Sequence, residues 1–305
     1  MADIDPKQIK ALREQTGAGF GDVKAALTEA NGNMEEARTI LRKKGLASAG
    51  KKAGRITAEG AVVAHVDGKT GVLVEVNCET DFVGRNEHFQ RFAAEVAKAL
   101  AQSGAATVEE FLAEKWPGSD ETVSQRVAEQ IASIKENISI RRFARYQAPQ
   151  NAVVGTYIHG GGRIGVMVEV QGCGNDGQTA EIAKDIAMHI AAAEPRFLRR
   201  EDVTQKDLDT EREIARDAAA KSGKPENIVE KMVSGKMEKF YAEFCLLEQA
   251  YIRDDKMTVT QYLKSKGKEA NCDYQIARFV RYKLGEGIEK RSEDFAAEVA
   301  SYIKQ

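Results

Sequence analysis

The chain has 305 residues, 42% of them hydrophobic and 30% charged, so it carries enough apolar material for two or three small cores. Lys+Arg 45 against Asp+Glu 47 gives a formal net charge of -2, which disfavours a protein held to nucleic acid or membranes by bulk charge. No stretch approaches the roughly 20 apolar residues of a membrane span, and the first residues lack a secretory or transit pattern. We therefore expect a cytoplasmic protein that contacts no membrane.

The four cysteines stand singly, without a Cys-x-x-Cys pair or a histidine cluster of the kind that binds zinc. Under the cytoplasmic expectation, reduced thiols are the rule. The prediction of four free thiols applies to Cys78, Cys173, Cys245 and Cys272.

The first 45 residues predict three short helices, at 6–15, 21–29 and 34–44, each with apolar residues spaced three or four apart. Glycines in Thr16–Gly19 break the chain between the first two helices, and Gly45 is expected to stop the third. A three-helix unit of this size resembles ubiquitin-associated modules, which usually bind other proteins.

A basic run follows this unit. Between Arg42 and Arg55 there are six Lys and Arg residues and no acidic residue. The run could bind RNA, or it could be a solvated, flexible tether. We favour the tether, because no aromatic side chain interleaves the charges to stack on bases.

An internal repeat follows the basic run. The pattern changes to strand-like alternation, and Gly71–Val76, the second strand of a predicted hairpin, recurs 94 positions later as Gly165–Val170. The helix sequence at 94–98 recurs only 86 positions later, at 180–184. The repeat is therefore strand, strand, connection and helix, and the first connection is eight residues longer than the second.

Other segments have helical or strand-like patterns. Apolar residues spaced three or four apart from Val123 to Ile138 predict one helix, and 201–221 with the stripe from Val229 to Phe244 predicts an inserted helical hairpin. A short helix at 258–266 and a strand at 276–284 follow. The last prediction is an amphipathic helix at 294–304.

Together these elements predict an α+β fold. It comprises an N-terminal three-helix module, a duplicated core of two antiparallel-sheet and helix subdomains, an inserted antiparallel helical hairpin and a C-terminal helix. The expected boundaries are 1–54 for the module with its basic linker, 55–150 for the first core subdomain, 151–203 with 244–290 for the second, 204–243 for the hairpin and 291–305 for the terminal helix.

The sequence offers little for an enzyme. Gly68-Lys69-Thr70 lacks the earlier glycine of a phosphate-binding loop and lies in a hairpin turn. The four histidines have neither metal-ligand spacing nor a nucleophile elbow beside them, and no carboxylate pair can be singled out for acid–base work. We predict a protein without catalytic residues, cofactor, bound metal or direct nucleotide binding.

The long connection of the first repeat is the strongest candidate for a functional site. It contains Thr80-Asp81-Phe82-Val83, and loops normally expose little apolar surface. The segment suits insertion into a partner. The alternative is that Phe82 packs into its own core while Asp81 caps the next helix.

Several motifs together closely resemble the bacterial elongation factor Ts family from end to end. They are Thr16-Gly-Ala-Gly19 with Asp22 and Lys24, Lys51-Lys52-Ala53, Glu75-Val-Asn-Cys-Glu-Thr-Asp-Phe-Val83, His189-Ile-Ala191, Ser222-Gly-Lys-Pro225 and Gly285-Glu-Gly-Ile-Glu-Lys290. Phe20-Gly21 departs from the family, which commonly has two methionines there; Phe20 could supply similar apolar area.

The resemblance implies a guanine-nucleotide exchange factor whose partner is the GTPase elongation factor Tu. Thr80, Asp81, Phe82 and Val83 would be the segment associated with displacing Mg²⁺ in the GTPase. Phe20 and Lys24 would dock the N-terminal module, the hairpin carrying His159 would face another domain of the partner, and the terminal helix would add a contact. The hairpin serves dimerisation in some members, so homodimerisation through 204–243 stays open.

Two alternatives come from other classes of protein. An RNA-associated adaptor would use the basic run at 42–55, and its binding would depend steeply on salt. A purely structural dimer would be built on the 204–243 hairpin.

Overall fold

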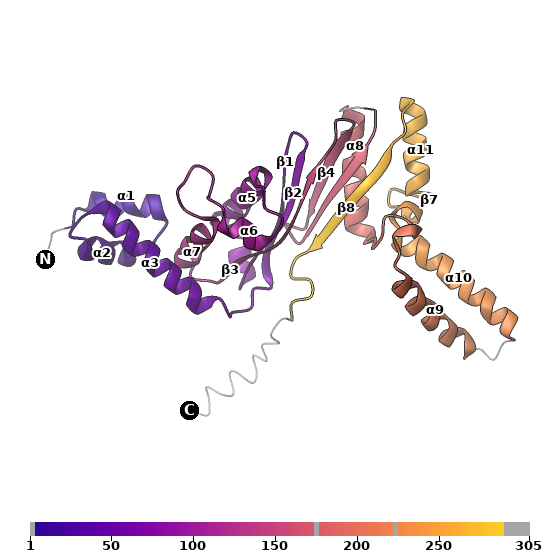
Figure 1. The fold of residues 1–305 in the computed structure, drawn as a ribbon, viewed down its shortest axis with the longest axis horizontal. Helices are drawn as coiled ribbons and strands as arrows, with labels where there is room; N and C mark the ends of the chain where they lie inside the picture. The colour runs from indigo at the N-terminus through magenta and orange to yellow at the C-terminus, as the bar shows by residue number, and fades with distance from the viewer. Residues whose placement is uncertain (1–3, 174–176, 222–224, 290–305) are drawn as a thin grey trace.

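The computed structural model describes residues 4–173, 177–221 and 225–289. Two three-stranded antiparallel sheets lie next to each other at the centre, and helices cover their outer sides (Figure 1). The N-terminal helices lie at one end of the molecule and a helical hairpin projects from the other (Figure 1). This α+β arrangement agrees with the predicted fold class.

The N-terminal module consists of three helices, close to the predicted ones. They are α1 (Pro6–Thr16), α2 (Phe20–Glu29) and α3 (Met34–Lys52). Side chains of Asp5 and Asn33 cap α1 and α3 by accepting main-chain N–H groups. The module has a small core of its own around Leu12, Val23 and Leu27.

The prediction that Gly45 stops the third helix is wrong, because α3 continues to Lys52. Gly45 is buried against α7 (Val123–Ile134), and a Cβ there would lie 3.5 Å from the carbonyl oxygen of Ala128. Its missing side chain allows two helices to pack closely instead of ending one.

The prediction of a flexible tether at 42–55 is also wrong, because α3 continues through most of this basic run. The basic residues from Arg42 to Lys52 lie on α3, which packs along α7. Lys44 forms an ion pair with Glu29 at 2.9 Å, and the Lys52 ammonium donates to the carbonyl oxygen of Ile131 at 3.4 Å. The module is therefore joined to the core by a continuous, docked helix.

The first core subdomain is one sheet covered by helices. Its elements are β1 (Glu59–Asp67), β2 (Thr70–Cys78), α4 (Asp81–Gly84), α5 (Glu87–Gln102), α6 (Val108–Ala113), α7 and β3 (Ile138–Gln147), with strand order β1-β2-β3. The outer face of the sheet packs on α5 through Val72, Val74 and Val76, while Leu73 points to the inner face. Strand β2 is buried on both faces, which explains its nearly continuous apolar sequence.

The sequence pattern missed β3. Ile138 continues the apolar spacing of α7, but the helix ends at Ile134 and Lys135 adopts a left-handed conformation with φ of 71°. Ile138 is instead the first residue of β3, paired with Cys78 of β2. The buried side chain of Ile138 fits both the helical spacing of α7 and the alternation of a strand, so spacing alone could not assign Ile138 to a helix or a strand.

The second core subdomain has the same order of two strands, a helix and a third strand as the first. It contains β4 (Ala152–His159), β5 (Ile164–Gln171), α8 (Gly177–Ala193) and β8 (Gln275–Lys283), with strand order β4-β5-β8. The register shifts between Glu75 and Val76 in the first sheet and between Glu169 and Val170 in the second. These positions are 94 residues apart, the repeat offset of the strands.

The segment inserted between α8 and β8 contains the helical hairpin. Its elements are a 3₁₀ turn (Arg200–Asp202), α9 (Gln205–Ala220), α10 (Glu226–Phe244), a second 3₁₀ turn (Leu246–Glu248), β6 (Ala250–Tyr251), β7 (Asp254–Thr258) and α11 (Val259–Ala270). The helices α9 and α10 pack against each other, and the first begins at Gln205 and not at residue 201, because Thr204 is its N-cap. The predicted helix at 294–304 lies outside the described residues.

The inner faces of the two sheets pack against each other through two equivalent glycines. A Cβ on Gly71 would lie 2.4 Å from Cγ1 of Val154, and a Cβ on Gly165 would lie 2.4 Å from Cγ1 of Val62. Real Cβ atoms do not approach other carbon atoms this closely. The sheets therefore require glycine at both positions.

Arginine and tyrosine side chains cross between the sheets in a reciprocal manner. The Arg142 guanidinium of β3 lies 4.3 Å from the ring centre of Tyr282 of β8, and Arg278 of β8 lies 4.1 Å from the ring centre of Tyr146 of β3. Each arginine also pairs with a carboxylate of its own sheet. These ion pairs are Arg142–Glu75 and Arg278–Glu169, both at 2.7 Å.

Glu75 is fully buried. Burial alone would raise its pKa, but hydrogen bonds from the Gly285 N–H, Arg142, Asn77 and Arg141 lower the pKa of this carboxyl below its ordinary value. Glu75 is therefore ionised at neutral pH and links the first sheet to the segment that follows β8.

The prediction of four free thiols is wrong for one pair, because Cys173 and Cys272 form a disulfide with their Cα atoms 5.8 Å apart. Cys173 follows β5 and Cys272 precedes β8, and these neighbouring strands pair Gln171 with Gln275. Strand pairing thus brings together two cysteines that are 99 residues apart in sequence. The remaining two, Cys78 and Cys245, are buried free thiols as predicted.

We predict that Gly165→Ala lowers the free energy of unfolding by about 1–3 kcal/mol, because the added methyl overpacks the contact with Val62 and Leu73. Urea unfolding measures the change. Gly50→Ala on α3 is the control: its Cβ meets open space, so stability should stay equal or rise. Adding Val62→Ala to Gly165→Ala should recover part of the lost stability. A Gly165→Ala variant with the same free energy of unfolding as the wild type would contradict the packing argument.

We also predict that reducing the Cys173–Cys272 disulfide lowers the free energy of unfolding by about 2–4 kcal/mol, because the bond closes a long loop in the unfolded chain. Urea unfolding with and without dithiothreitol measures this, and a Cys173→Ser/Cys272→Ser variant should not respond to the reductant. Thiol titration of the unfolded, unreduced chain should find only Cys78 and Cys245; reactive thiols at all four positions would refute the bond.

Candidate functional site

Phe82 is the most exposed large apolar side chain in the described part of the molecule, with 84% of its surface in solvent. It is the second residue of α4, a helix of one turn that is separated from β2 by Glu79 and Thr80. The alternative that Phe82 packs into its own core is therefore wrong. The aromatic ring is free to contact another molecule.

Thr80 caps α4. Its hydroxyl oxygen accepts the Val83 N–H at 3.4 Å. The expectation that Asp81 would cap a helix is wrong, since Asp81 lies inside the turn and forms an ion pair with Arg85 at 3.0 Å. Asp81 and Phe82 are therefore presented side by side on the outer surface of a capped turn.

Close main-chain contact fixes the inner side of α4. A Cβ on Gly84 would lie 3.0 Å from the carbonyl oxygen of Gly60 in β1, and Gly60 itself has a φ of 128°. The Gln90 side-chain amide donates to the carbonyl oxygen of Gly84, and Val83 packs against the core of the first subdomain. Val83 and Gly84 thus anchor the segment, while Phe82 before them stays exposed.

Cys78 lies just before the segment and stabilises the main chain that leads into it. Its thiol donates to the carbonyl oxygen of Thr80 at 3.2 Å. Burial raises the pKa of this thiol to about 12, and the nearby Glu136 carboxylate adds to the effect. The thiol stays protonated at neutral pH, as its donor role requires.

The segment faces the turn of the second hairpin across a small cavity of about 200 Å³. Asp81, Gly84 and Arg85 line one part of this cavity, and Gly160, Gly161 and Arg163 line another. His159 lies exposed at the end of β4, at the start of that turn, and its Nδ1 is 3.1 Å from the Tyr157 hydroxyl. Two predicted contact elements, one from each repeat, therefore share one side of the core.

Comparison with known proteins gives the family. A family model described as Elongation factor TS matches residues 79–286, more than half of the chain. The elongation factor Ts of Syntrophotalea carbinolica is 50% identical over 302 residues, which cover 99% of both chains. That of Clostridium perfringens is 52% identical over 299 residues, covering 97% of this chain and 98% of the relative. The chain belongs to the elongation factor Ts family.

Membership in the elongation factor Ts family places the chain among the translation elongation factors of protein biosynthesis. The elongation factor Ts of Halothermothrix orenii covers 99% of the chain at 47% identity, so the likeness extends to the N-terminal module. The range matched by the family model contains the Thr80–Val83 segment and His159.

The predicted docking residues Phe20 and Lys24 lie on α2 of the N-terminal module (Figure 1). Phe20 is the first residue of the helix and is 55% exposed, and Lys24 is exposed one turn later. The spacing of four residues places both on one face of α2. The module therefore offers a small mixed surface of one aromatic ring and one cation.

Sequence reasoning missed the residues that connect the two halves. Arg142-Phe-Ala-Arg-Tyr146 recurs as Arg278-Phe-Val-Arg-Tyr282, and this repeated motif marks β3 and β8 as equivalent strands. Comparing the ends of the two repeats could have found it. The partner of Thr80 across the sheet, Glu136, has no such signal, because it is 56 residues away and has no counterpart motif.

Within residues 4–173, 177–221 and 225–289, no group of three or more His, Cys, Asp or Glu side chains could hold a metal ion. Among the helices of the same ranges, none combines the length and apolar character that a membrane span requires.

Proposed function

We propose that this chain is a guanine-nucleotide exchange factor for elongation factor Tu and that Phe82 is the side chain that enters the GTPase. The observation that carries the proposal is the exposure of Phe82 on a capped and anchored turn. Membership in the elongation factor Ts family supports the choice of partner.

The proposed mechanism requires no contact with the nucleotide. A GTPase holds GDP largely through its phosphates and a Mg²⁺ ion, so a protein that moves the groups holding Mg²⁺ can release GDP. Phe82 would separate these elements, and Asp81 beside it would repel the acidic and phosphate groups around the ion. By linkage, nucleotide must weaken binding of the factor by the same ratio.

Phe82 cannot supply the whole effect. A ten-thousandfold acceleration of release would need about 5.5 kcal/mol, whereas burying one phenylalanine contributes about 1.5–3 kcal/mol. Other contacts must hold the GTPase in the distorted state. The N-terminal module with Phe20 and Lys24, the hairpin at His159 and the terminal segment at 291–305 are the proposed sources, the last lying outside the described residues.

We predict that Phe82→Ala lowers the maximum rate of GDP release by between about tenfold and a hundredfold, because the burial energy of the ring is lost. Stopped-flow release of fluorescent GDP from preloaded elongation factor Tu measures the rate. Ile214→Ala removes another exposed apolar side chain, on α9, and should leave the rate unchanged. Full stimulation by Phe82→Ala would overturn the role of the ring.

We predict a different kinetic effect for the module. Phe20→Ala and Lys24→Ala should raise the concentration of factor that gives half the maximum rate several-fold, because they weaken docking. The maximum rate at saturation should fall less than for Phe82→Ala, because each residue supplies only part of the contacts proposed to hold the distorted GTPase. Lys10→Ala on α1, where the side chain is 80% exposed, serves as the control. A normal half-saturating concentration with a reduced maximum rate would contradict the docking role.

A further inference from the structure

Residues 133–137, the end of α7 and the turn that leads from it into β3, contact both parts of the molecule to which partner contacts are assigned. On one side they reach the N-terminal module, and on the other they reach the Thr80–Val83 segment. They lie between elements that are more than 50 residues away from them in sequence. We name this segment the 133–137 turn.

Glu136 holds the start of the Thr80–Val83 segment. Its carboxylate accepts the N–H of Glu79 at 3.1 Å, the N–H of Thr80 at 3.0 Å and the hydroxyl of Thr80 at 2.6 Å. Hydrogen bonds to a carboxylate are stronger than those to neutral acceptors. One side chain therefore fixes two main-chain groups and one hydroxyl directly before Phe82.

The Thr80 hydroxyl joins this contact to the cap of α4. A hydroxyl has one proton and two lone pairs. Since the proton is donated to Glu136, a lone pair is left to accept the Val83 N–H. Glu136 thereby orients the group that caps the turn carrying Phe82.

A reciprocal contact completes the connection. The Glu79 carboxylate accepts the main-chain N–H of Asn137, while the Asn137 side-chain amide donates to the carbonyl oxygen of Arg55 at 3.1 Å. Arg55 in turn forms an ion pair with Glu79 at 3.2 Å. Glu136, before β3, thus accepts main-chain N–H groups from the residues after β2, and Glu79, after β2, accepts one from the residue before β3.

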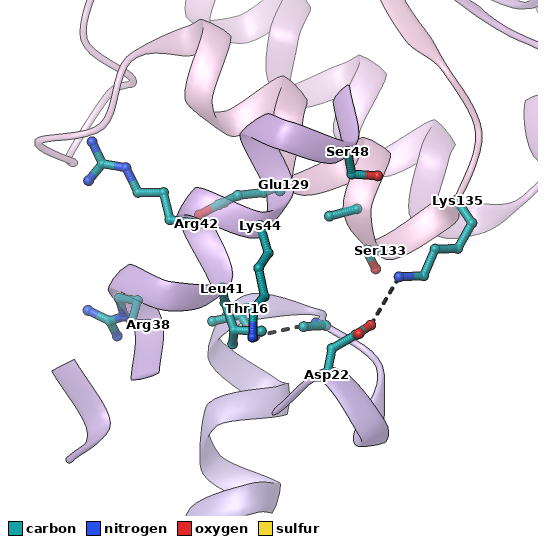
Figure 2. Close-up of a pocket in the computed structure, with 13 residues that line it drawn as sticks. Thr16, Asp22, Arg38, Leu41, Arg42, Lys44, Ser48, Glu129, Ser133 and Lys135 are labelled. Carbon is teal, nitrogen blue, oxygen red and sulfur yellow. Dashed lines mark hydrogen bonds and ion pairs between the residues drawn. The ribbon is translucent and has the colours of Figure 1, made fainter. Parts of the chain in front are cut away.

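The other side of the turn holds the module. Figure 2 shows Asp22 of α2 and Lys135 pointing toward each other, with the ion pair at 3.0 Å, and Ser133 beside them. The Ser133 hydroxyl donates to the carbonyl oxygen of Gly17 at 2.6 Å. These contacts border a cavity of about 170 Å³ between the module and α7 (Figure 2).

We infer that Glu136 is a positioning residue for nucleotide exchange: it holds Thr80 so that Phe82 is presented in a fixed direction relative to the docked N-terminal module. The inference rests on the proposed function. Glu136 itself makes no contact with the nucleotide in this mechanism and acts through Phe82.

The test is a double-mutant cycle in the fluorescent GDP release assay with elongation factor Tu. Glu136→Gln should lower the maximum rate about tenfold, while the half-saturating concentration stays within twofold of wild type. In a Phe82→Ala background the same substitution should have no further effect. Thr80→Val, which removes the hydroxyl at similar size, should match Glu136→Gln.

Hydrogen exchange on the free chain provides a readout independent of activity. Glu136→Gln should increase exchange at the amides of Glu79 and Thr80 while the core sheets stay protected. Glu110→Gln is the matched control, because this carboxylate also accepts a main-chain N–H, that of Ala106 at 2.7 Å, but outside the segment. It should leave both exchange at 79–83 and the release rate unchanged.

Three results with Glu136→Gln would overturn the inference. They are a Glu136→Gln rate equal to wild type, faster amide exchange without a slower release, or additive losses in the Phe82→Ala background. The proposed function fails in a distinguishable way, namely if the wild-type chain does not accelerate release or if Phe82→Ala retains full stimulation. A loss shared equally by Glu110→Gln would indicate general destabilisation and would also count against the inference.

Discussion

Two glycines at equivalent positions, Gly71 and Gly165, allow the central sheets to approach so closely that a single added carbon on either would collide with a valine of the other sheet. The remaining contacts between the halves depend on that distance. The arginine of each outer strand reaches a tyrosine of the opposite sheet only because the strands are this near. The glycine contacts and the arginine–tyrosine contacts between the two halves are therefore each made twice, once from each sheet.

In this core the connection from the second strand to the following helix differs between the two repeats. The second repeat passes from β5 to α8 without an aromatic residue, whereas the first inserts α4, capped by Thr80 and anchored by Gly84. The buried carboxylates Glu75 and Glu169 occupy equivalent positions in both halves, but only Glu75 accepts an N–H from Gly285. The scaffold is thus symmetric where the sheets pack and asymmetric at the connection that carries Phe82.

Local patterns in the sequence were sufficient for the hairpins and for the helices of the N-terminal module, because each depends on neighbours within about ten residues. Comparing the sequence with itself found the repeat, but whether Phe82 is exposed or packs into its own core stayed open. Local patterns failed where tertiary contacts decide. Gly45 looks like a helix stop until α7 is placed against it, and Ile138 fits a helical stripe until β2 supplies a strand partner. The disulfide of Cys173 with Cys272 likewise requires the pairing of β5 with β8.

An exposed aromatic ring cannot be held by apolar packing on its outer side, so its direction must come from the main chain that carries it. In this chain the main chain at Thr80 is fixed by polar contacts from Glu136, and the adjoining Lys135 fixes the module through Asp22. A flexible tether would allow the module to bind a GTPase without placing Phe82 anywhere in particular. In the proposed mechanism, with α3 continuous along α7, the free energy that the module gains by docking is available at Phe82, because moving one moves the other.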